Sequence, residues 1–194
     1  NSKTYQLGSG IHDLAQSALK VNHFSELAKP RLQKIANTFD MTATATSKAD
    51  DQHLALTAFA NPPSSISIRV SLGGRVPLFS GASGRIFAAY GDMSEKQIRF
   101  NFNQINWVEP IAFTKWMLQV QEAKSKGYAI DQEEFMVGVS AIAVPVYTPD
   151  NFVLNTIGVL AINSQLEKIK RIEIINLLKE TAQDISLNLI REIN

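Results

Sequence analysis

The stretch GYAIDQEEFMVGVSAIAVPVY, residues 127–147, changes character halfway along its length. A glycine and three acidic residues occupy its first half, and from Phe135 onward every residue is uncharged. Such an uncharged run predicts a strand in the middle of a sheet, buried on at least part of both faces. Pro145 has no N–H to donate to a neighbouring strand, so we expect that end of the strand at a bulge or at a sheet edge.

The acidic half of this stretch has two interpretations. Asp131 and Glu134 form a D-x-x-E pattern, which resembles a capping box for a turn that begins at Gln132. Alternatively, one of the carboxylates faces a ligand cavity and lies against the apolar strand that follows. The sequence alone leaves both interpretations open.

Apolar residues at helical spacing in the first forty positions predict two helices. The first covers residues 11–19, after the end of a strand in TYQLGSG (4–10). The second is capped by Ser25, with Pro30 tolerated near its first turn. The period then drops to two, which predicts three strands, at residues 41–47, 53–60 and 65–72.

The second half of the chain adds helices and two further strands. Small residues in GASGRIFAAY (81–90) predict a loop that turns into a helix, and Ser94 is expected to cap a short one. Pro110 suits the first turn of a long helix that ends at Gly127. Two strands joined by the turn TPDN and a final amphipathic helix complete the chain. Strands joined by tight hairpins make an antiparallel sheet, so we expect an α+β domain with helices packed on the sheet.

The composition excludes several classes of protein. The chain has 194 residues with 19 basic and 18 acidic side chains, so its net charge of +1 gives no electrostatic footprint for nucleic acid. It has no cysteine and no apolar stretch that could span a bilayer. We therefore expect a soluble, cytoplasmic protein that forms one domain.

No motif in the chain organises a reaction or holds a metal. His12, His23 and His53 are not paired at ligand spacing, so neither a metal nor another cofactor is expected. The segment GASGR lacks the spacing of a phosphate-binding loop, a dinucleotide fingerprint or a hydrolase nucleophile. If Ala82 to Gly84 open a helix, their N–H groups suit a carboxylate or a phosphate. These small residues equally suit a tight turn without a ligand.

Several stretches together resemble one family. GYAIDQEEFMVGVSAIAVPVY followed by FVLNTIGVLAI is similar to the signature region of the effector-binding domain of IclR-type bacterial transcriptional regulators. LAKPRLQKIANTF (27–39) and RVSLGGRVPLFSGASGRIFAAYG (69–91) resemble two further segments of that domain, in the same order. YQLG resembles the strand that closes the preceding DNA-binding domain.

The resemblance implies a GAF-like (profilin-like) fold, with a small-molecule pocket between the sheet and the loops over it. It implies that residues 1–8 end a linker from an absent winged helix-turn-helix domain and that residues 9–194 form the effector-binding domain. The expected partners are an organic acid or aromatic metabolite and further copies of the chain, as a dimer or dimer of dimers. DNA would be bound only through the absent domain, no membrane is expected, and the chain would not be an enzyme.

Carried over to this sequence, the resemblance implies effector-binding positions at the start of the helix after residue 80, in the acidic turn and on the last two strands. These are Ala82, Ser83, Gly84, Asp131, Val139, Ala141, Gly158 and Leu160. Family members that bind small polar acids tend to have hydrogen-bonding side chains where this chain has Ala141, Gly158 and Leu160. A larger and more apolar effector is therefore expected. The alternative is an enzyme that uses the same cavity, with Asp131 as its general acid or base.

We predict that this chain alone forms a two-fold dimer, because helices are in surplus around a single modest sheet and because of the family resemblance. We also predict that it does not bind DNA specifically, because its net charge is near zero and it has no recognition helix. Sedimentation equilibrium at micromolar concentration, with and without duplex DNA at physiological salt, measures both properties. A sole 21.4 kDa species would contradict the dimer, and a sequence-dependent complex of nanomolar affinity would contradict the absence of DNA binding.

Overall fold

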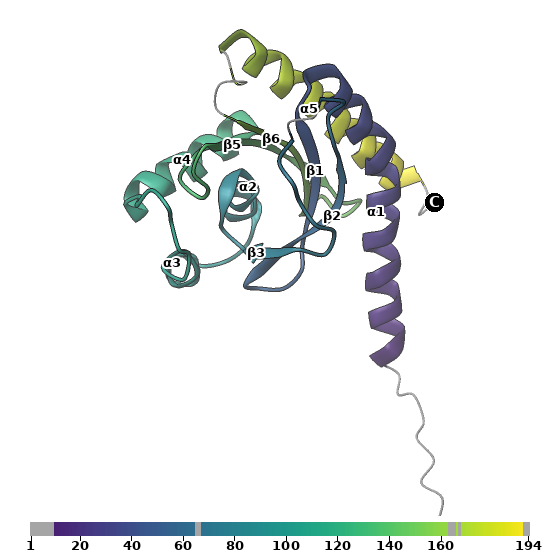
Figure 1. The fold of residues 1–194 in the computed structure, drawn as a ribbon. Helices are drawn as coiled ribbons and strands as arrows, with labels where there is room; N and C mark the ends of the chain where they lie inside the picture. Colours follow the sequence, from purple (N-terminus) through teal and green to yellow (C-terminus); the bar gives the residue numbers. More distant parts are fainter. Residues whose placement is uncertain (1–9, 65–66, 163–165, 167, 192–194) are drawn as a thin grey trace, which may run out of the picture.

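The computed structural model describes residues 10–64, 67–162, 166 and 168–191 (Figure 1). Five helices and six strands occur in this part of the chain. Their order is α1 (Gly10–Phe39), β1 (Thr42–Lys48), β2 (His53–Ala60), β3 (Arg75–Pro77), α2 (Gly81–Tyr90), α3 (Glu95–Phe102), α4 (Phe113–Lys126), β4 (Ala129–Gln132), β5 (Val139–Tyr147), β6 (Val153–Ile162) and α5 (Lys168–Arg191). None of these helices is long and apolar enough to cross a membrane.

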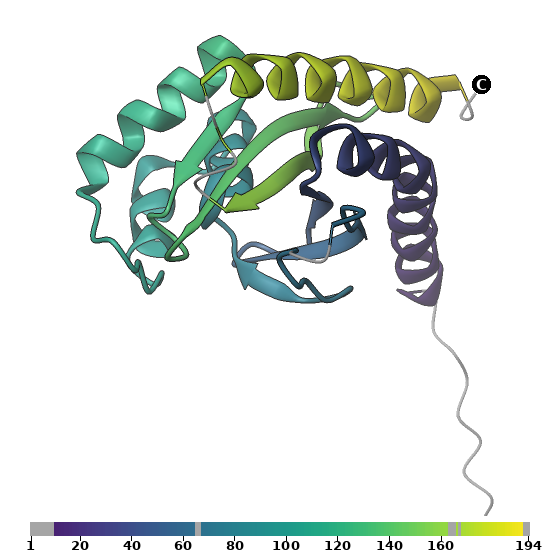
Figure 2. The same cartoon turned by 45° about the horizontal axis from the view of Figure 1, so that its top comes forward.

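The six strands form one antiparallel sheet in the order β3-β2-β1-β6-β5-β4. The sheet curves around α2, and α1 and α5 lie across its other face (Figures 1 and 2). The predicted α+β class and the antiparallel sheet flanked by helices are both confirmed. Strand β5 pairs with β6 on one side and with β4 on the other, so the apolar run does lie inside the sheet.

Alternation along the strands separates the two faces of the sheet. On β1, Ala43 and Ala45 pack into the core that α1 and α5 cover, whereas Thr44 and Thr46 line a cavity on the opposite face. The helix-covered core also takes Ile142, Val144, Ile157 and Val159 from β5 and β6. A second core joins α2, α3 and α4 around Trp116 and Phe79. A period of two thus places alternate residues of one strand in different surroundings.

The two helices predicted near the N-terminus are one, α1, and this prediction is wrong. Ser25 is buried inside the helix instead of capping it. One buried stripe continues through the expected boundary on Phe24, Ala28, Leu32, Ile35 and Ala36, and its packing outweighs the local preference of serine for a helix end. Pro30 lies inside α1 on its exposed side. Proline there removes one backbone hydrogen bond and bends a helix, and α1 is visibly bent (Figure 2).

The third predicted strand is also misplaced. Residues 67–72 have no strand pairing, and β3 forms at Arg75–Pro77 instead. Gly73 takes a positive φ of 72°, and its N–H donates to the Leu56 carbonyl, which turns the chain back onto β2 just before β3. The strand predicted to end in TYQLGSG falls on residues 1–9, outside the described part of the chain.

Strand β4 was not predicted at all. Its four residues were taken for part of the acidic turn, but they pair with β5, and Asp131 lies opposite Ala141. The strand was missed because it has only four residues and lies next to acidic residues and a glycine, which are typical of turns. The turn itself begins one residue after Gln132.

The prediction for Pro145 is confirmed. Pairing between β4 and β5 ends at Ala129 and Ala143, so Pro145 lies where β5 has no neighbour on that side. A register shift follows between Val146 and Tyr147. The Tyr147 N–H then donates to the Ser186 hydroxyl of α5 at 2.9 Å, so a helix side chain replaces the missing strand.

The helix boundaries after residue 80 follow the sequence closely. Ser94 caps α3 through a capping box with Gln97, as its residue type predicts. Gly127 ends α4 with a left-handed φ of 70°. Pro110, however, lies before α4, which starts at Phe113 with Ala112 as its N-cap residue. Pro110 therefore lies in the loop before α4 and not in the first turn of the helix, so this part of the prediction is wrong.

Position 84 requires glycine, because the backbone of Phe79 comes very close to it. A Cβ atom on Gly84 would lie 2.1 Å from the Phe79 carbonyl carbon, because the loop before α2 folds back over the first turn of the helix. This contact fixes where α2 starts relative to the sheet. The start of α2 in turn forms part of the cavity wall.

We predict that Gly84→Ala lowers the free energy of unfolding by roughly 1–3 kcal/mol or more, because overpacking against backbone atoms cannot relax easily. Helix propensity alone would favour alanine by about 0.5–1 kcal/mol, so the sign itself is informative. Asn176→Ala, at an exposed site in α5, serves as the control and is expected to stabilise slightly. Urea unfolding measures both, and a Gly84→Ala protein as stable as the control would contradict the close approach.

Candidate functional site

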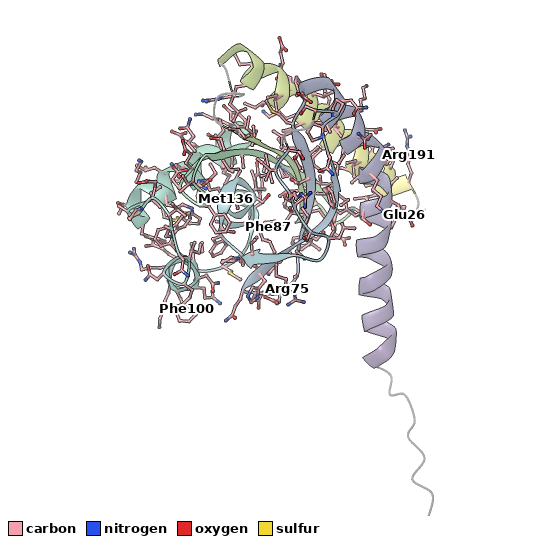
Figure 3. All side chains as sticks on the ribbon, in the orientation of Figure 1. Glu26, Arg75, Phe87, Phe100, Met136 and Arg191 are labelled. Carbon is pink, nitrogen blue, oxygen red and sulfur yellow. The ribbon has the colours of Figure 1, made fainter. Side chains whose placement is uncertain are left out.

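A cavity of about 280 Å³ lies between the curved sheet and the start of α2. Both edges of the sheet contribute to it, since Arg75 and Val76 come from β3 and Phe135 and Met136 follow β4. Figure 3 labels Arg75 and Met136 among the side chains drawn on the ribbon. The remaining lining residues are mostly aliphatic or small: Thr44, Thr46, Leu54, Leu56, Val70, Ser71, Gly74, Ser80, Gly81, Ala82, Ser83, Asp131, Val139, Ala141, Ile142, Ala143, Gly158, Val159 and Leu160.

The structure brings together seven of the eight residues carried over from the family resemblance. The cavity is lined by Ala82, Ser83, Asp131, Val139, Ala141, Gly158 and Leu160. Gly84 does not line it, and its N–H donates to the Ser80 carbonyl at 3.0 Å. The N–H groups without an intrahelical partner are therefore those of Gly81, Ala82 and Ser83, one residue earlier than predicted.

Small side chains form the cavity floor, and this explains why a space remains there. Gly158 pairs with Ala143 on β5 and with Thr44 on β1, so three small residues lie side by side in the middle of the sheet. A Cβ atom on Gly158 would lie 2.3 Å from the Ile142 carbonyl oxygen. No larger residue fits that position without moving a strand.

The acid at the cavity wall is part of a buried charged network. Arg85 of α2 is fully buried, and its guanidinium lies 2.9 Å from Asp131 Oδ1 and 3.5 Å from Glu134 Oε2. It also donates to the Gly81 carbonyl and to the Gln119 amide oxygen. Gln119 of α4 in turn donates to Glu134 at 3.1 Å. The network therefore joins α2, α4, β4 and the turn after β4.

Each interpretation of the acidic turn describes part of what is found. Asp131 Oδ2 accepts an N–H from Phe135, at a long 3.5 Å, and Glu134 Oε2 accepts the N–H of Gln132 at 2.6 Å. These are local caps, although not the predicted capping box. The second interpretation stays a prediction as regards a ligand; its geometry is present, because Asp131 lines the cavity and pairs with Ala141 of β5.

The two carboxyls respond in opposite ways to the same surroundings. Burial raises the pKa of Asp131 to about 6, although Arg85 favours its ionised form, and nearby Glu134 adds to the rise. Burial would also raise the pKa of Glu134, but the Gln132 N–H and the Arg85 guanidinium together hold it below its ordinary value. Glu134 is thus the firmly ionised partner of Arg85, and Asp131 is the carboxyl that exchanges a proton closer to neutrality.

Few ionisable side chains line this cavity. Among the described residues that line it, Arg75 and Asp131 carry them. The Ser83 hydroxyl shares a hydrogen bond with the Thr156 hydroxyl at 2.9 Å. No cluster of potential metal ligands occurs in the described residues.

The main functional residue that the sequence analysis missed is Arg85. Its segment was considered only for backbone N–H groups, yet a lone cation in the apolar run RIFAAY needs a buried anion as a partner. Two acids at Asp131 and Glu134 were the obvious candidates. Thr44, Thr46 and Phe135 were also missed as lining residues, and only their positions on the curved sheet reveal them.

Residues 16–187 match the family described as Bacterial transcriptional regulator IclR C-terminal. The chain is 24% identical over 189 residues to the DNA-binding transcriptional repressor YiaJ of Escherichia coli, covering 94% of this chain and 67% of that protein. The fold is similar to that of an IclR transcriptional regulator from Alicyclobacillus acidocaldarius, with 28% identity, a TM-score of 0.78, and coverage of 95% of this chain and 75% of that one.

It is also similar to a PobR inducer-binding domain from Acinetobacter, solved as a double mutant with 3-hydroxybenzoic acid. The TM-score is 0.69 and the identity 20%, over 84% of this chain and 97% of that one. At this identity the likeness concerns the fold.

We predict that Arg85→Met lowers the free energy of unfolding by about 3–5 kcal/mol, because it leaves the buried Asp131 and the partly buried Glu134 without their cation. Lys126→Met breaks an exposed ion pair with Glu122 and should leave stability nearly unchanged. Adding Asp131→Asn to Arg85→Met should recover part of the loss. Chemical unfolding of the three variants measures these differences, and equal stability of the Arg85 and Lys126 variants would show that the network does not hold the fold.

Proposed function

Because the chain belongs to the IclR C-terminal family of bacterial transcriptional regulators, we propose that its cavity binds the small-molecule effector of such a regulator. The observation that carries this proposal is the cavity itself, an apolar space with one buried acid on its wall. A pocket of this kind, with few polar groups, is typical of a small-molecule site.

The lining residues favour an effector with an apolar body and a hydrogen-bond donor. Leu160, Val139 and Ala141 offer no hydrogen bonds from their side chains, which suits an aromatic or aliphatic acid. Asp131 Oδ1 accepts from Arg85, whereas Oδ2 accepts the Phe135 N–H at a long 3.5 Å, so Oδ2 can also accept from a hydroxyl or amine. A donor there would favour the ionised carboxylate.

The effector would act on DNA indirectly. We propose that a winged helix-turn-helix domain precedes residues 9–194 in the whole protein, and that copies of this domain associate in pairs. Effector binding would then shift the equilibrium between arrangements of the pair, and with it the spacing of the DNA-binding domains. The relatives, which are transcriptional regulators, support this role.

The enzyme alternative has one observation in its favour. The pKa of Asp131, raised by burial to about 6, would suit a general acid or base. However, its Oδ1 is held by Arg85, and among the described residues that line the cavity Arg75 is the one other ionisable group. A binding role therefore accounts for the site better, and ligands in the cavity should stabilise the protein without being turned over.

We predict that a thermal-shift screen of aromatic and aliphatic acids, with 3-hydroxybenzoate included, finds a ligand that stabilises the chain. At a hundred times its Kd such a ligand adds about 2.7 kcal/mol. Leu160→Ser should weaken the binding of the most apolar ligands, whereas Leu118→Ser, at an exposed site on α4, should not. Asp131→Asn should weaken the binding of ligands that carry a hydroxyl or amine by roughly 1–3 kcal/mol.

Calorimetric titration of the three variants measures these changes. Identical affinities for the Leu160 and Leu118 variants would mean that the ligand does not bind in this cavity. A screen in which no compound stabilises the wild-type chain would count against an effector site altogether.

A further inference from the structure

The acid on the cavity wall shares its cation with a second acid. Arg85 Nη1 lies 2.9 Å from Asp131 Oδ1, and Arg85 Nη2 lies 3.5 Å from Glu134 Oε2. Within the described part of the chain, Nη2 makes no hydrogen bond. The side chains of Asp131 and Glu134 are 4% and 13% exposed, and that of Arg85 is fully buried. When both carboxyls are ionised, this network therefore carries one more negative charge than positive charge.

The Asp131 side chain lies on the face of the sheet that lines the cavity. It is opposite Ala141, which also lines the cavity, whereas the preceding residue, Ile130, packs against the core that α1 and α5 cover. Alternate residues of a strand point to opposite faces of the sheet. The excess negative charge of the network is thus next to the cavity and not on the far side of the sheet.

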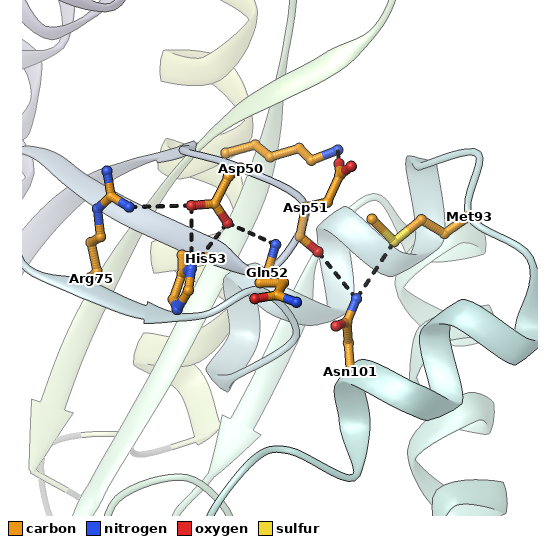
Figure 4. Close-up of polar contacts among 8 residues, drawn as sticks. Asp50, Asp51, Gln52, His53, Arg75, Met93 and Asn101 are labelled. Carbon is orange, nitrogen blue, oxygen red and sulfur yellow. Dashed lines mark hydrogen bonds and ion pairs between the residues drawn. The ribbon is translucent and has the colours of Figure 1, made fainter.

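The second cationic residue of the cavity lining does not offset this charge. Val76, the residue after Arg75, lines the cavity together with its partner on β2, so the Arg75 side chain points to the opposite face. There, Arg75 Nη1 lies 3.2 Å from Asp50 Oδ2 in a separate exposed cluster (Figure 4). Among the described residues, Arg85 is the one cation that acts on Asp131.

Glu134 keeps its charge although it does not line the cavity. Its Oε2 accepts the Gln132 N–H at 2.6 Å, and its Oε1 accepts from Gln119 Nε2 at 3.1 Å. Burial disfavours the charge, but these donors and Arg85 hold the pKa of Glu134 below its ordinary value. Arg85 therefore faces a firmly ionised carboxylate on each side, and its charge is divided between Asp131 and Glu134.

We propose that Glu134 sets the charge of the group that the cavity accepts beside Asp131, so that an effector with an ammonium group binds more tightly than one with a hydroxyl. Glu134 is a positioning residue in this role, because it acts through Arg85 and outside the cavity lining. The inference rests on the proposed function, because it names the group that the effector presents in the same cavity. A hydroxyl supplies a donor for Asp131 Oδ2, whereas an ammonium also supplies the positive charge that the network lacks. The apolar lining screens charge weakly, which enlarges this difference.

Three benzoic acids that differ in one substituent serve as matched probes. They are 3-(aminomethyl)benzoate with an ammonium group, 3-(hydroxymethyl)benzoate with a hydroxyl and 3-ethylbenzoate with neither. Glu134→Gln removes the charge in the network, and Glu122→Gln removes one from an exposed ion pair on α4 as the control. Calorimetric titration of the full chain at about pH 7.5, where Asp131 is ionised, measures the affinities. Binding of 3-ethylbenzoate shows whether the cavity of each variant is intact.

We predict that the wild-type chain binds the ammonium compound roughly 3- to 10-fold more tightly than the hydroxyl compound, because a charge-assisted hydrogen bond is the stronger one. Glu134→Gln should reduce this advantage to within about 2-fold, since Arg85 then compensates Asp131 alone. Glu122→Gln should leave the advantage unchanged, and 3-ethylbenzoate should bind all three proteins equally.

The pH dependence distinguishes this role from a structural one. Burial and, to a lesser extent, Glu134 raise the pKa of Asp131 to about 6, so lowering the pH from about 7.5 to about 5 should weaken ammonium binding about 10-fold. The groups around Asp131 are Arg85 from α2, Glu134 from the turn, and the uncharged Ala141 from β5. Without the charge of Glu134 the pKa of Asp131 falls, so Glu134→Gln should lose less affinity at the lower pH.

Two results would overturn the role of Glu134 while the effector site stands. One is equal binding of the ammonium and hydroxyl compounds by the wild-type chain, and the other is the same ammonium advantage in the Glu134 and Glu122 variants. Failure of all three probes to bind the wild-type chain would overturn this inference and also count against the effector site.

Discussion

The buried contact between Arg85 and Asp131 is the interaction on which the rest of the cavity depends. It joins the helix on the concave face of the sheet to the edge strand β4, and Gln119 and Glu134 extend it to α4 and to the turn after β4. A buried cation without its partners would be strongly unfavourable. The position of α2, and with it the N–H groups at the cavity wall, is therefore tied to the position of Asp131. The Asp131 carboxyl thus holds the start of α2 in position and also lines the cavity.

The cavity also exists because the middle of the sheet lacks large side chains on the face toward α2. Along its middle, Thr44, Ala143 and Gly158 lie side by side where larger residues would reach α2. The opposite face at the same level is filled by Ile142, Ile157 and Val159 beneath α1 and α5. The sheet thus has one face packed for stability and one left open, and alternate residues of the same strands are responsible for both.

Much of this could be predicted from the sequence, for identifiable reasons. Four of the strands and the helix ends at Ser94 and Gly127 carry local signals, namely period-two alternation and capping residues, and these signals were read correctly. The continuity of α1 could not be predicted, because a buried stripe formed by distant contacts overrides Ser25 and Pro30. Strand β4 could not be predicted either, since four residues next to acidic neighbours carry too little pattern. At the site, seven of the lining residues followed from the family resemblance, whereas Thr44, Thr46 and Phe135 did not, and Arg85 required knowing which distant acids it meets.

The length of α1 has a mechanical consequence. The helix packs on β1 and β2, whose other faces line the cavity, and its first turns extend beyond the sheet (Figure 1). The twenty helical residues before Pro30 span about 30 Å, so this part of the bent helix acts as an arm attached to the part that packs on the sheet. A rotation of about 5° at the sheet moves the N-terminal end of α1 by about 3 Å on the same rise per residue. A displacement too small to disturb the packing around an effector would therefore become, by leverage alone, a shift of a few ångströms at the N-terminal end of α1.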